Sequence, residues 1–213
     1  MSIQQIMSFF NSLVENDLYS DYGYIIFNEL RKYADADSVL LINSLTGYFA
    51  EQDMDTIYSI CAAKKCLVIN DISGSIGTEI AKVGDILVCS FGLDKPLNYG
   101  EGGLIAVSNK EWFNLTQILE DDFGAPFRKK LLDLEKRITY LKDINKKIKK
   151  ELNDFDIIHK EKKGINVVVK IKNELQKQQL IKYCDDNKYE YTECPRYIRV
   201  NCDAISIEVK RLQ

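Results

Sequence analysis

The chain has 213 residues, a net charge of −3 and an isoelectric point of about 5.4. This length fits one domain of ordinary size with a small appendage, and 46% hydrophobic residues are enough for a full core. The slight acidity gives no electrostatic argument for a nucleic-acid partner. No apolar stretch approaches the roughly 18 residues of a membrane span, so we expect no membrane partner.

The six cysteines form no closely spaced pairs, and no apolar signal segment opens the chain. This usage is typical of a reducing cytosol, so we predict a cytoplasmic location. Three cysteines lie in apolar stretches and are expected in the core: Cys61, Cys66 and Cys89. The others are spaced too irregularly for a zinc site and His159 is the only histidine, so we expect no metal site.

The predicted elements begin with two helices. Apolar residues recur at helical spacing over residues 3–14, and a second helix is predicted to run to about Tyr33. Three tyrosines, Tyr19, Tyr22 and Tyr24, lie in the polar turn between them. We expect these rings to form a half-buried packing surface; the alternative is that one of them stacks on a cofactor.

Residues 39–109 alternate between strands and helices, which indicates a mostly parallel sheet with right-handed crossovers. A helix is predicted over Asp53–Ala63, with Asp53 as a candidate cap, and a short helical turn over Ser75–Ala81. Short runs of β-branched residues, bounded by Gly, Asp, Ser or Asn, predict buried strands at Val39–Ile42, Leu67–Ile69, Ile86–Cys89 and Leu104–Val107.

Polar side chains follow two of these strands at the point where each strand ends. Asp71 comes just after Leu67–Ile69, and Ser90 and Lys95 follow Ile86–Cys89. In open α/β sheets, ligands bind outside the carboxyl ends of the strands. An acid, a hydroxyl and a lysine can therefore converge on one crevice.

A long helix is predicted over residues 129–163, after a break at Gly124 and Pro126, and Gly164 closes it. Its apolar residues follow three- and four-residue spacing, interrupted by Asn145, and a polar residue on such a seam can set register. We expect the helix to pack along the domain edge, with a coiled coil as the alternative. Its lysines are interleaved with acids, which favours a solvated face over a nucleic-acid patch.

Shorter elements flank this helix. We predict a short helix over Trp112–Leu119 and, after Gly164, a small α/β lobe with strands at Val167–Ile171, Ile198–Asn201 and Ile205–Val209 and a helix at Glu174–Asp185. The predicted domains are a large domain over residues 1–128, a linking helix over 129–163 and the small lobe over 164–213.

The segment from Ser38 to about Lys110 resembles the DegT/DnrJ/EryC1/StrS sugar aminotransferases, which are fold-type I pyridoxal-phosphate enzymes. The runs VINDISGSIG, DILVCSFGLDK and YGEGGLIAVSN carry the resemblance by their order and spacing. The resemblance implies that Asp71 pairs with the pyridine nitrogen of pyridoxal 5′-phosphate, that Ser90 holds the cofactor phosphate and that Lys95 is the Schiff-base lysine. It also implies that the strand after Gly102-Gly103 runs antiparallel to the others.

The chain departs from the family pattern at several points. Family members are nearly twice as long, so their phosphate-binding turn and ring-stacking aromatic would lie before residue 1. Gly74 stands where the family has Gln, Gly92 where His is common, and Ser44 where an earlier strand often ends in His. The predicted fold class is α/β: a truncated fold-type I aminotransferase-like chain with a mostly parallel sheet flanked by helices and a small C-terminal α/β lobe.

Three functions stay open. The first is an aminotransferase that acts on a small molecule, a keto-sugar nucleotide by family precedent, with its cofactor site completed in a homodimer. The second is one half of a split enzyme with a separately encoded N-terminal partner. The third is a degenerate scaffold that serves as a binding or structural protein. Arg196 and Arg199 either bind a substrate anion or form a surface pair.

Overall fold

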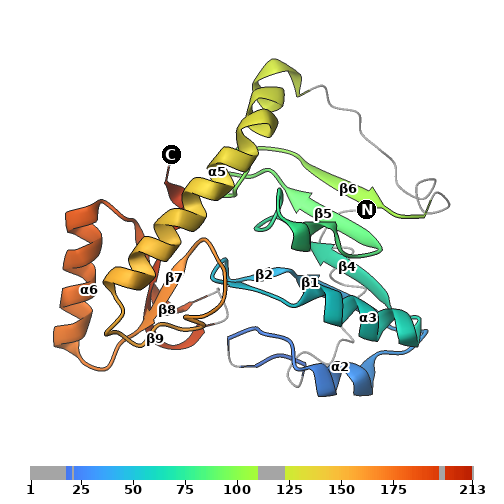
Figure 1. The fold of residues 1–213 in the computed structure, drawn as a ribbon, viewed down its shortest axis with the longest axis horizontal. Helices are drawn as coiled ribbons and strands as arrows, with labels where there is room; N and C mark the ends of the chain where they lie inside the picture. Colours follow the sequence, from blue (N-terminus) through green and yellow to red (C-terminus); the bar gives the residue numbers. More distant parts are fainter. Residues whose placement is uncertain (1–17, 21, 110–122, 197–199, 213) are drawn as a thin grey trace.

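The computed structural model describes residues 18–20, 22–109, 123–196 and 200–212 (Figure 1). The helices predicted over residues 3–14 and Trp112–Leu119, and the residue Arg199, lie outside these ranges, as does the side chain of Arg196. Within the described residues, no helix is both long and apolar enough to cross a membrane.

The larger sheet contains four strands whose spatial order follows the chain (Figure 1). Three of them run parallel and the last runs antiparallel, which confirms the prediction. The pairing brings the carboxyl ends of the second and third strands to the same edge of the sheet. The strands, in order, are β1 (Val39–Asn43), β4 (Leu67–Asp71), β5 (Ile86–Ser90) and β6 (Gly103–Val107).

Two helices pack beside this sheet. α3 (Met54–Lys64) begins at Asp53, whose carboxylate accepts a hydrogen bond from the backbone N–H of Thr56 at 3.1 Å, so the predicted cap is confirmed. Its apolar face joins buried residues of β1 and β4 in one cluster, together with α2 (Phe27–Tyr33). The turn predicted over Ser75–Ala81 is instead a series of turns followed by the 3₁₀ helix η1 (Glu79–Lys82).

A short hairpin follows β1 and reaches across to the second half of the chain. It consists of β2 (Leu45–Thr46) and β3 (Ala50–Glu51). Leu45 belongs to a core cluster with the C-terminal strands, and Phe49 belongs to another. The hairpin therefore connects the larger sheet with the C-terminal lobe, which is formed by the helices and strands that follow Gly164.

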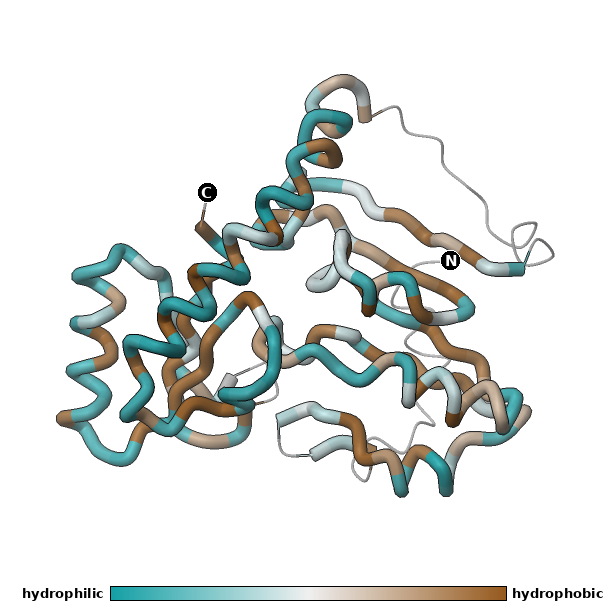
Figure 2. The backbone as a smooth tube through the Cα atoms, in the orientation of Figure 1, coloured by the Kyte–Doolittle hydropathy of each residue, from teal (hydrophilic) through white to brown (hydrophobic). Residues whose placement is uncertain are grey.

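This C-terminal lobe is built on an antiparallel sheet in the order β7-β9-β8. Its strands are among the apolar parts of the chain, whereas its helix is mostly hydrophilic (Figure 2). The elements are β7 (Val167–Lys170), α6 (Glu174–Asn187), β8 (Tyr191–Arg196), β9 (Val200–Ile207) and the 3₁₀ helix η2 (Val209–Arg211).

The strand predictions for this lobe were partly wrong. Ile198–Asn201 and Ile205–Val209 were predicted as separate strands, but Val200–Ile207 is one strand, and β8 was not predicted. Pro195 weakens the strand signal of β8, because proline cannot donate a ladder hydrogen bond. It is tolerated here because β8 is an edge strand.

The long helix α5 (Gly124–Glu151) lies between the two sheets (Figure 1). Its first half contributes Leu134 and Ile138 to a cluster with the larger sheet, and its second half contributes Leu141 and Ile148 to the core of the C-terminal lobe. It therefore packs along the domain edge. Asn145 is buried on this helix, and its side-chain amide donates to the backbone oxygen of Asn166 at 2.7 Å.

The predicted bounds of this helix, 129–163, were wrong at both ends. Pro126 lies in the first turn, where its missing N–H is no loss, so it does not break the helix. At the other end the helix stops at Glu151, and Asn153 begins a turn region in which such residues are favoured. Gly164 lies well beyond that end.

Tyr22 and Tyr24 form a packing surface, the first of their two predicted roles. Their ring centroids lie 5.8 and 5.4 Å from that of His159, which also stacks on Phe49. Tyr19 donates instead to the backbone oxygen of Leu41. Tyr22 and Tyr24 therefore pack the N-terminal part of the described chain against His159.

The burial of His159 predicts a pH dependence of stability. Burial, aided by Lys162 and Lys149, lowers the pKa of His159, and its Nε2 lacks a partner within the described part of the chain. The unfolded chain therefore binds this proton more readily than the folded chain. The free energy of unfolding therefore keeps its full value above the His159 pKa of the unfolded chain, about 6.5, and declines as the pH falls below it.

We expect the urea midpoint of the wild type to fall between pH 7.5 and 5.5 more steeply than that of His159→Phe, which keeps an aromatic ring but cannot be protonated. Parallel denaturation curves at several pH values measure the two slopes. Equal slopes would show that His159 does not set this pH dependence.

Candidate cofactor site

Asp71 ends β4 with a half-buried carboxylate. Its Oδ1 accepts the backbone N–H of Ser73 at 2.9 Å, and its Oδ2 accepts the side-chain amide of Asn43 at 3.2 Å. Asn43 is the register partner of Asp71 on β1, so the parallel pairing itself brings these groups together. Each carboxylate oxygen has a second lone pair, so Asp71 can accept a further hydrogen bond from a ligand.

Ser90 ends the neighbouring strand β5 and is exposed. Its backbone N–H donates to Ser73 Oγ at 2.9 Å, which links it to the turn that also caps Asp71. Its own Oγ accepts the backbone N–H of Gly92 at 3.2 Å. The hydroxyl proton of Ser90 is therefore available to a phosphate oxygen.

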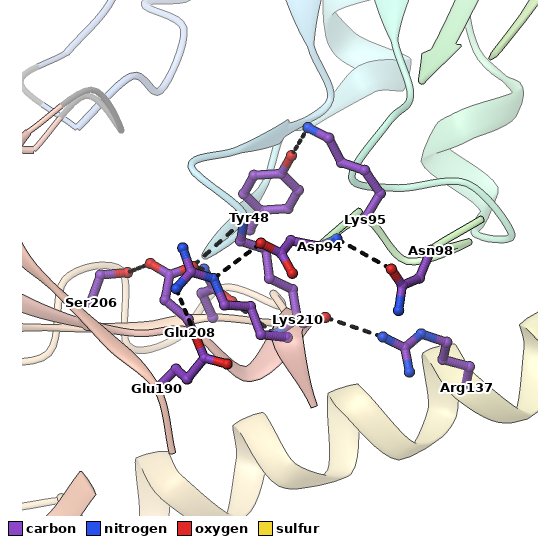
Figure 3. Close-up of polar contacts among 11 residues, drawn as sticks. Tyr48, Asp94, Lys95, Asn98, Arg137, Glu190, Ser206, Glu208 and Lys210 are labelled. Atoms are coloured by element: carbon purple, nitrogen blue, oxygen red, sulfur yellow. Dashed lines mark hydrogen bonds and ion pairs between the residues drawn. The ribbon is translucent and has the colours of Figure 1, made fainter. Parts of the chain in front are cut away.

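Lys95 lies in the turn that follows β5. The backbone oxygen of Phe91 closes this turn by accepting the N–H groups of Tyr99 and Gly100 at 3.0 and 2.8 Å. Buried side chains, Phe91 and Leu97, anchor the turn in the core. The amine of Lys95 donates a hydrogen bond to the phenol oxygen of Tyr48 (Figure 3).

Tyr48 is a site residue that the sequence analysis missed. It lies at the tip of the β2–β3 hairpin with a left-handed backbone, at φ 65°. Burial raises the pKa of Tyr48, while Lys95 lowers it and Asp71 raises it. The amine of Lys95 lies 5.1 Å from the Tyr48 ring centroid. No motif marks Tyr48 in the sequence, although its place after Gly47 predicts a turn.

The C-terminal lobe adds charged side chains to the other side of Tyr48 (Figure 3). The ammonium of Lys210 lies 4.4 Å from the Tyr48 ring centroid and 3.7 Å from the carboxylate of Glu208. Glu208 also accepts hydrogen bonds from Asn166 and Ser206, both at 2.9 Å. The buried Lys210–Glu208 pair therefore forms a fixed wall beside the ring.

Two arginines fasten this lobe to the turn that carries Lys95. Arg211 pairs with Asp94 at 3.5 Å, and with Glu190 at 2.8 Å. From α5, Arg137 donates to the backbone oxygen of Pro96 at 2.8 Å and to that of Lys210 at 3.2 Å. The lysine turn is thus held both from α5 and from the C-terminal lobe.

The three residues predicted for pyridoxal phosphate lie at one edge of the sheet. Their donor set fits the polar groups of this cofactor: an amine for the aldehyde, a carboxylate for the ring nitrogen and a hydroxyl for the phosphate. Two hollows of the described surface lie elsewhere, along α3. Asp71, Ser90 and Lys95 line neither of these hollows.

Two family models match separate parts of the chain. Residues 34–125 match the DegT/DnrJ/EryC1/StrS aminotransferase family, and residues 134–213 match the MJ1341 family C-terminal domain. No curated protein matches the sequence.

Solved structures show a likeness over most of the chain. The E. coli GDP-4-keto-6-deoxy-D-mannose-3-dehydratase with bound hydrated PLP is 13% identical, with a TM-score of 0.64 over 88% of this chain and 67% of its own. The 3-amino-5-hydroxybenzoic acid synthase is 12% identical, with a TM-score of 0.60 over 90% of this chain and 67% of its own.

The apo cysteine desulfurase from Thermococcus onnurineus NA1 is 13% identical, with a TM-score of 0.59 over 90% of this chain and 62% of its own. These likenesses show the fold: this chain has the architecture of part of a fold-type I pyridoxal-phosphate enzyme. It spans only 62–67% of the length of the three solved chains.

Proposed function

We propose that this chain, in which residues 34–125 form a DegT/DnrJ/EryC1/StrS aminotransferase family domain, supplies the lysine-bearing part of a pyridoxal-phosphate site. Lys95 is the lysine that holds the cofactor covalently, Asp71 binds its ring nitrogen and Ser90 binds its phosphate. The observation that carries the proposal is that Asp71, at the end of β4, and Lys95, in the turn after the adjacent strand β5, lie at the same edge of the sheet.

Each residue has a distinct task in this proposal. Pyridoxal phosphate, when bound, supplies an electron sink for negative charge at the substrate carbon. Asp71 accepts a hydrogen bond from the ring nitrogen and keeps that nitrogen protonated, which the sink requires. The amine of Lys95, once released, would take up the proton that leaves the substrate carbon and deliver it to the former aldehyde carbon of the cofactor. The family suggests a keto-sugar nucleotide as the amino-group acceptor.

The remaining cofactor contacts come from a further polypeptide segment, in this proposal from a second copy in a homodimer. Exposed apolar side chains near the site support such a contact. Ile105 on the edge strand β6 is 58% exposed, and Leu93 in the lysine turn is 71% exposed. Light scattering should return a dimer; a monomer that binds cofactor only with cell extract would favour a separately encoded partner.

A cofactor titration tests the role of Lys95. The wild-type chain should develop a saturable visible absorbance with pyridoxal phosphate, and Lys95→Ala should lose it. Lys82→Ala is the control, because Lys82 is an exposed surface lysine outside the site. Equal saturable signals from the wild type and Lys95→Ala would contradict the assignment. A wild type that gives none, with or without cell extract, would favour the scaffold interpretation.

A further inference from the structure

Tyr48 joins the two halves of the chain at the candidate site. Its hydroxyl accepts a hydrogen bond from the amine of Lys95, and its ring lies beside the ammonium of Lys210 (Figure 3). Lys95 belongs to the turn after β5, and Lys210 to the end of the C-terminal lobe. Tyr48 is therefore the side chain through which the C-terminal lobe contacts the predicted cofactor lysine.

The backbone and the surroundings hold this ring in place. The backbone oxygen of Tyr48 accepts the N–H groups of Ile165 and Asn166 at 2.8 and 2.9 Å, which fixes the hairpin tip to the C-terminal lobe. The ring packs against Gly74: a Cβ at that position would lie 3.0 Å from two of the ring carbons. Gly74 therefore leaves the space that the ring of Tyr48 uses.

We propose that Tyr48 is a positioning residue for Lys95: its hydroxyl holds the lysine amine and presents it to the aldehyde of the cofactor. This inference rests on the proposed function and goes beyond it, since it makes the hairpin and the C-terminal lobe part of the site. The half-buried phenol, whose pKa is raised by burial, stays uncharged and can accept the hydrogen bond from Lys95. When the aldehyde arrives, the amine gives up its hydrogen bond to the phenol oxygen and contacts the aldehyde instead.

The reactivity of Lys95 tests the inference without any cofactor. Reductive methylation with formaldehyde, followed by peptide mass spectrometry, gives a labelling rate for each lysine. Tyr48→Phe removes the hydroxyl and keeps the ring, so the freed amine should react about threefold to tenfold faster, as expected for one lost hydrogen bond. Lys82, an exposed lysine outside the site, should react as before.

Two further variants separate positioning from a general loosening of the fold. Tyr58→Phe removes a phenol that bonds to Asp85 elsewhere in the chain, and it should leave the rate at Lys95 unchanged. Gly74→Ala should displace the Tyr48 ring and raise the rate at Lys95, but not when Tyr48 is already Ala. An unchanged rate at Lys95 in Tyr48→Phe, or an equal rise at all lysines, would overturn the inference.

A second readout uses pyridoxal phosphate and borohydride. A positioning role predicts that Tyr48→Phe lowers the share of cofactor trapped at Lys95 while small-reagent labelling of Lys95 rises. A lower share of trapped cofactor together with a higher methylation rate at Lys95 supports the inference. A rise or a fall of both quantities together contradicts it. If the wild type traps no cofactor at Lys95 but Tyr48→Phe still accelerates methylation, the contact is confirmed, whereas the proposed function and the catalytic purpose of Tyr48 are refuted together.

Discussion

Gly164→Ala is expected to destabilise the fold by at least about 3 kcal/mol. A Cβ at Gly164 would lie 2.4 Å from the backbone oxygen of Phe49 and 2.5 Å from its carbonyl carbon, so the backbones must separate. The hydrogen bonds on either side, from Glu51 to Lys163 and from Ile165 to Tyr48, both measure 2.8 Å and would lengthen. Overpacking costs about 1–3 kcal/mol, and each weakened hydrogen bond about 1 kcal/mol more.

Urea denaturation gives this loss directly. Gly92→Ala is the matched control, because a Cβ there would meet only Ser90 Oγ at an ordinary 3.4 Å. It should change the free energy of unfolding by less than about 0.5 kcal/mol. Equal effects of the two substitutions would mean that the close contact between the hairpin and the C-terminal lobe is not tight in solution.

Lys210→Met is expected to cost about 3 kcal/mol at neutral pH, because it leaves a buried carboxylate without its cation. The side chain of Glu208 is only 1% exposed, and that of Lys210 only 8%. The hydrogen bonds from Asn166 and Ser206 remain, but they do not balance the charge of Glu208. The cost should fall when Glu208→Gln is added, since the neutral amide needs no cation.

The control for this substitution is Lys182→Met. Lys182 also pairs with a carboxylate, that of Asp186 at 3.0 Å, but the two side chains are 75% and 60% exposed. Such a surface pair contributes less than about 1 kcal/mol. If Lys210→Met were as mild as Lys182→Met, the Lys210–Glu208 pair would not be the wall of the site that the structure describes.

The strands of the larger sheet were predictable because their apolar runs are short, β-branched and closed by turn residues. The errors in the predicted element bounds arose where the sequence patterns of a helix and of a strand overlap. Apolar residues continue at helical spacing beyond Glu151, yet Ile157 and Ile158 lie in different core clusters, and Ile157 bridges to Val169 in a β fashion. Only the residues that pack against Ile157 and Ile158 in the folded chain decide whether this segment is helical or extended.

Part of the candidate site was predictable in the same way. Asp71 and Ser90 end strands that pair side by side, and Lys95 lies in the turn after the second of them, so the topology of the sheet brings these residues to one edge. Tyr48 and Lys210 come from a hairpin tip and from the chain's last residues, and neither belongs to a motif. Their contact with each other and with Lys95 depends on how the C-terminal lobe packs, which no local pattern encodes.

The most direct test of the central claim is to identify which lysine carries the cofactor. The wild-type chain is incubated with pyridoxal phosphate, reduced with borohydride, digested and mapped by mass spectrometry, with Asp71→Ala treated in parallel. We predict that the adduct lies predominantly on Lys95 in the wild type and that the Asp71→Ala chain captures markedly less. An adduct spread evenly over the exposed lysines, or one equally abundant in Asp71→Ala, would contradict a site built from Lys95 and Asp71.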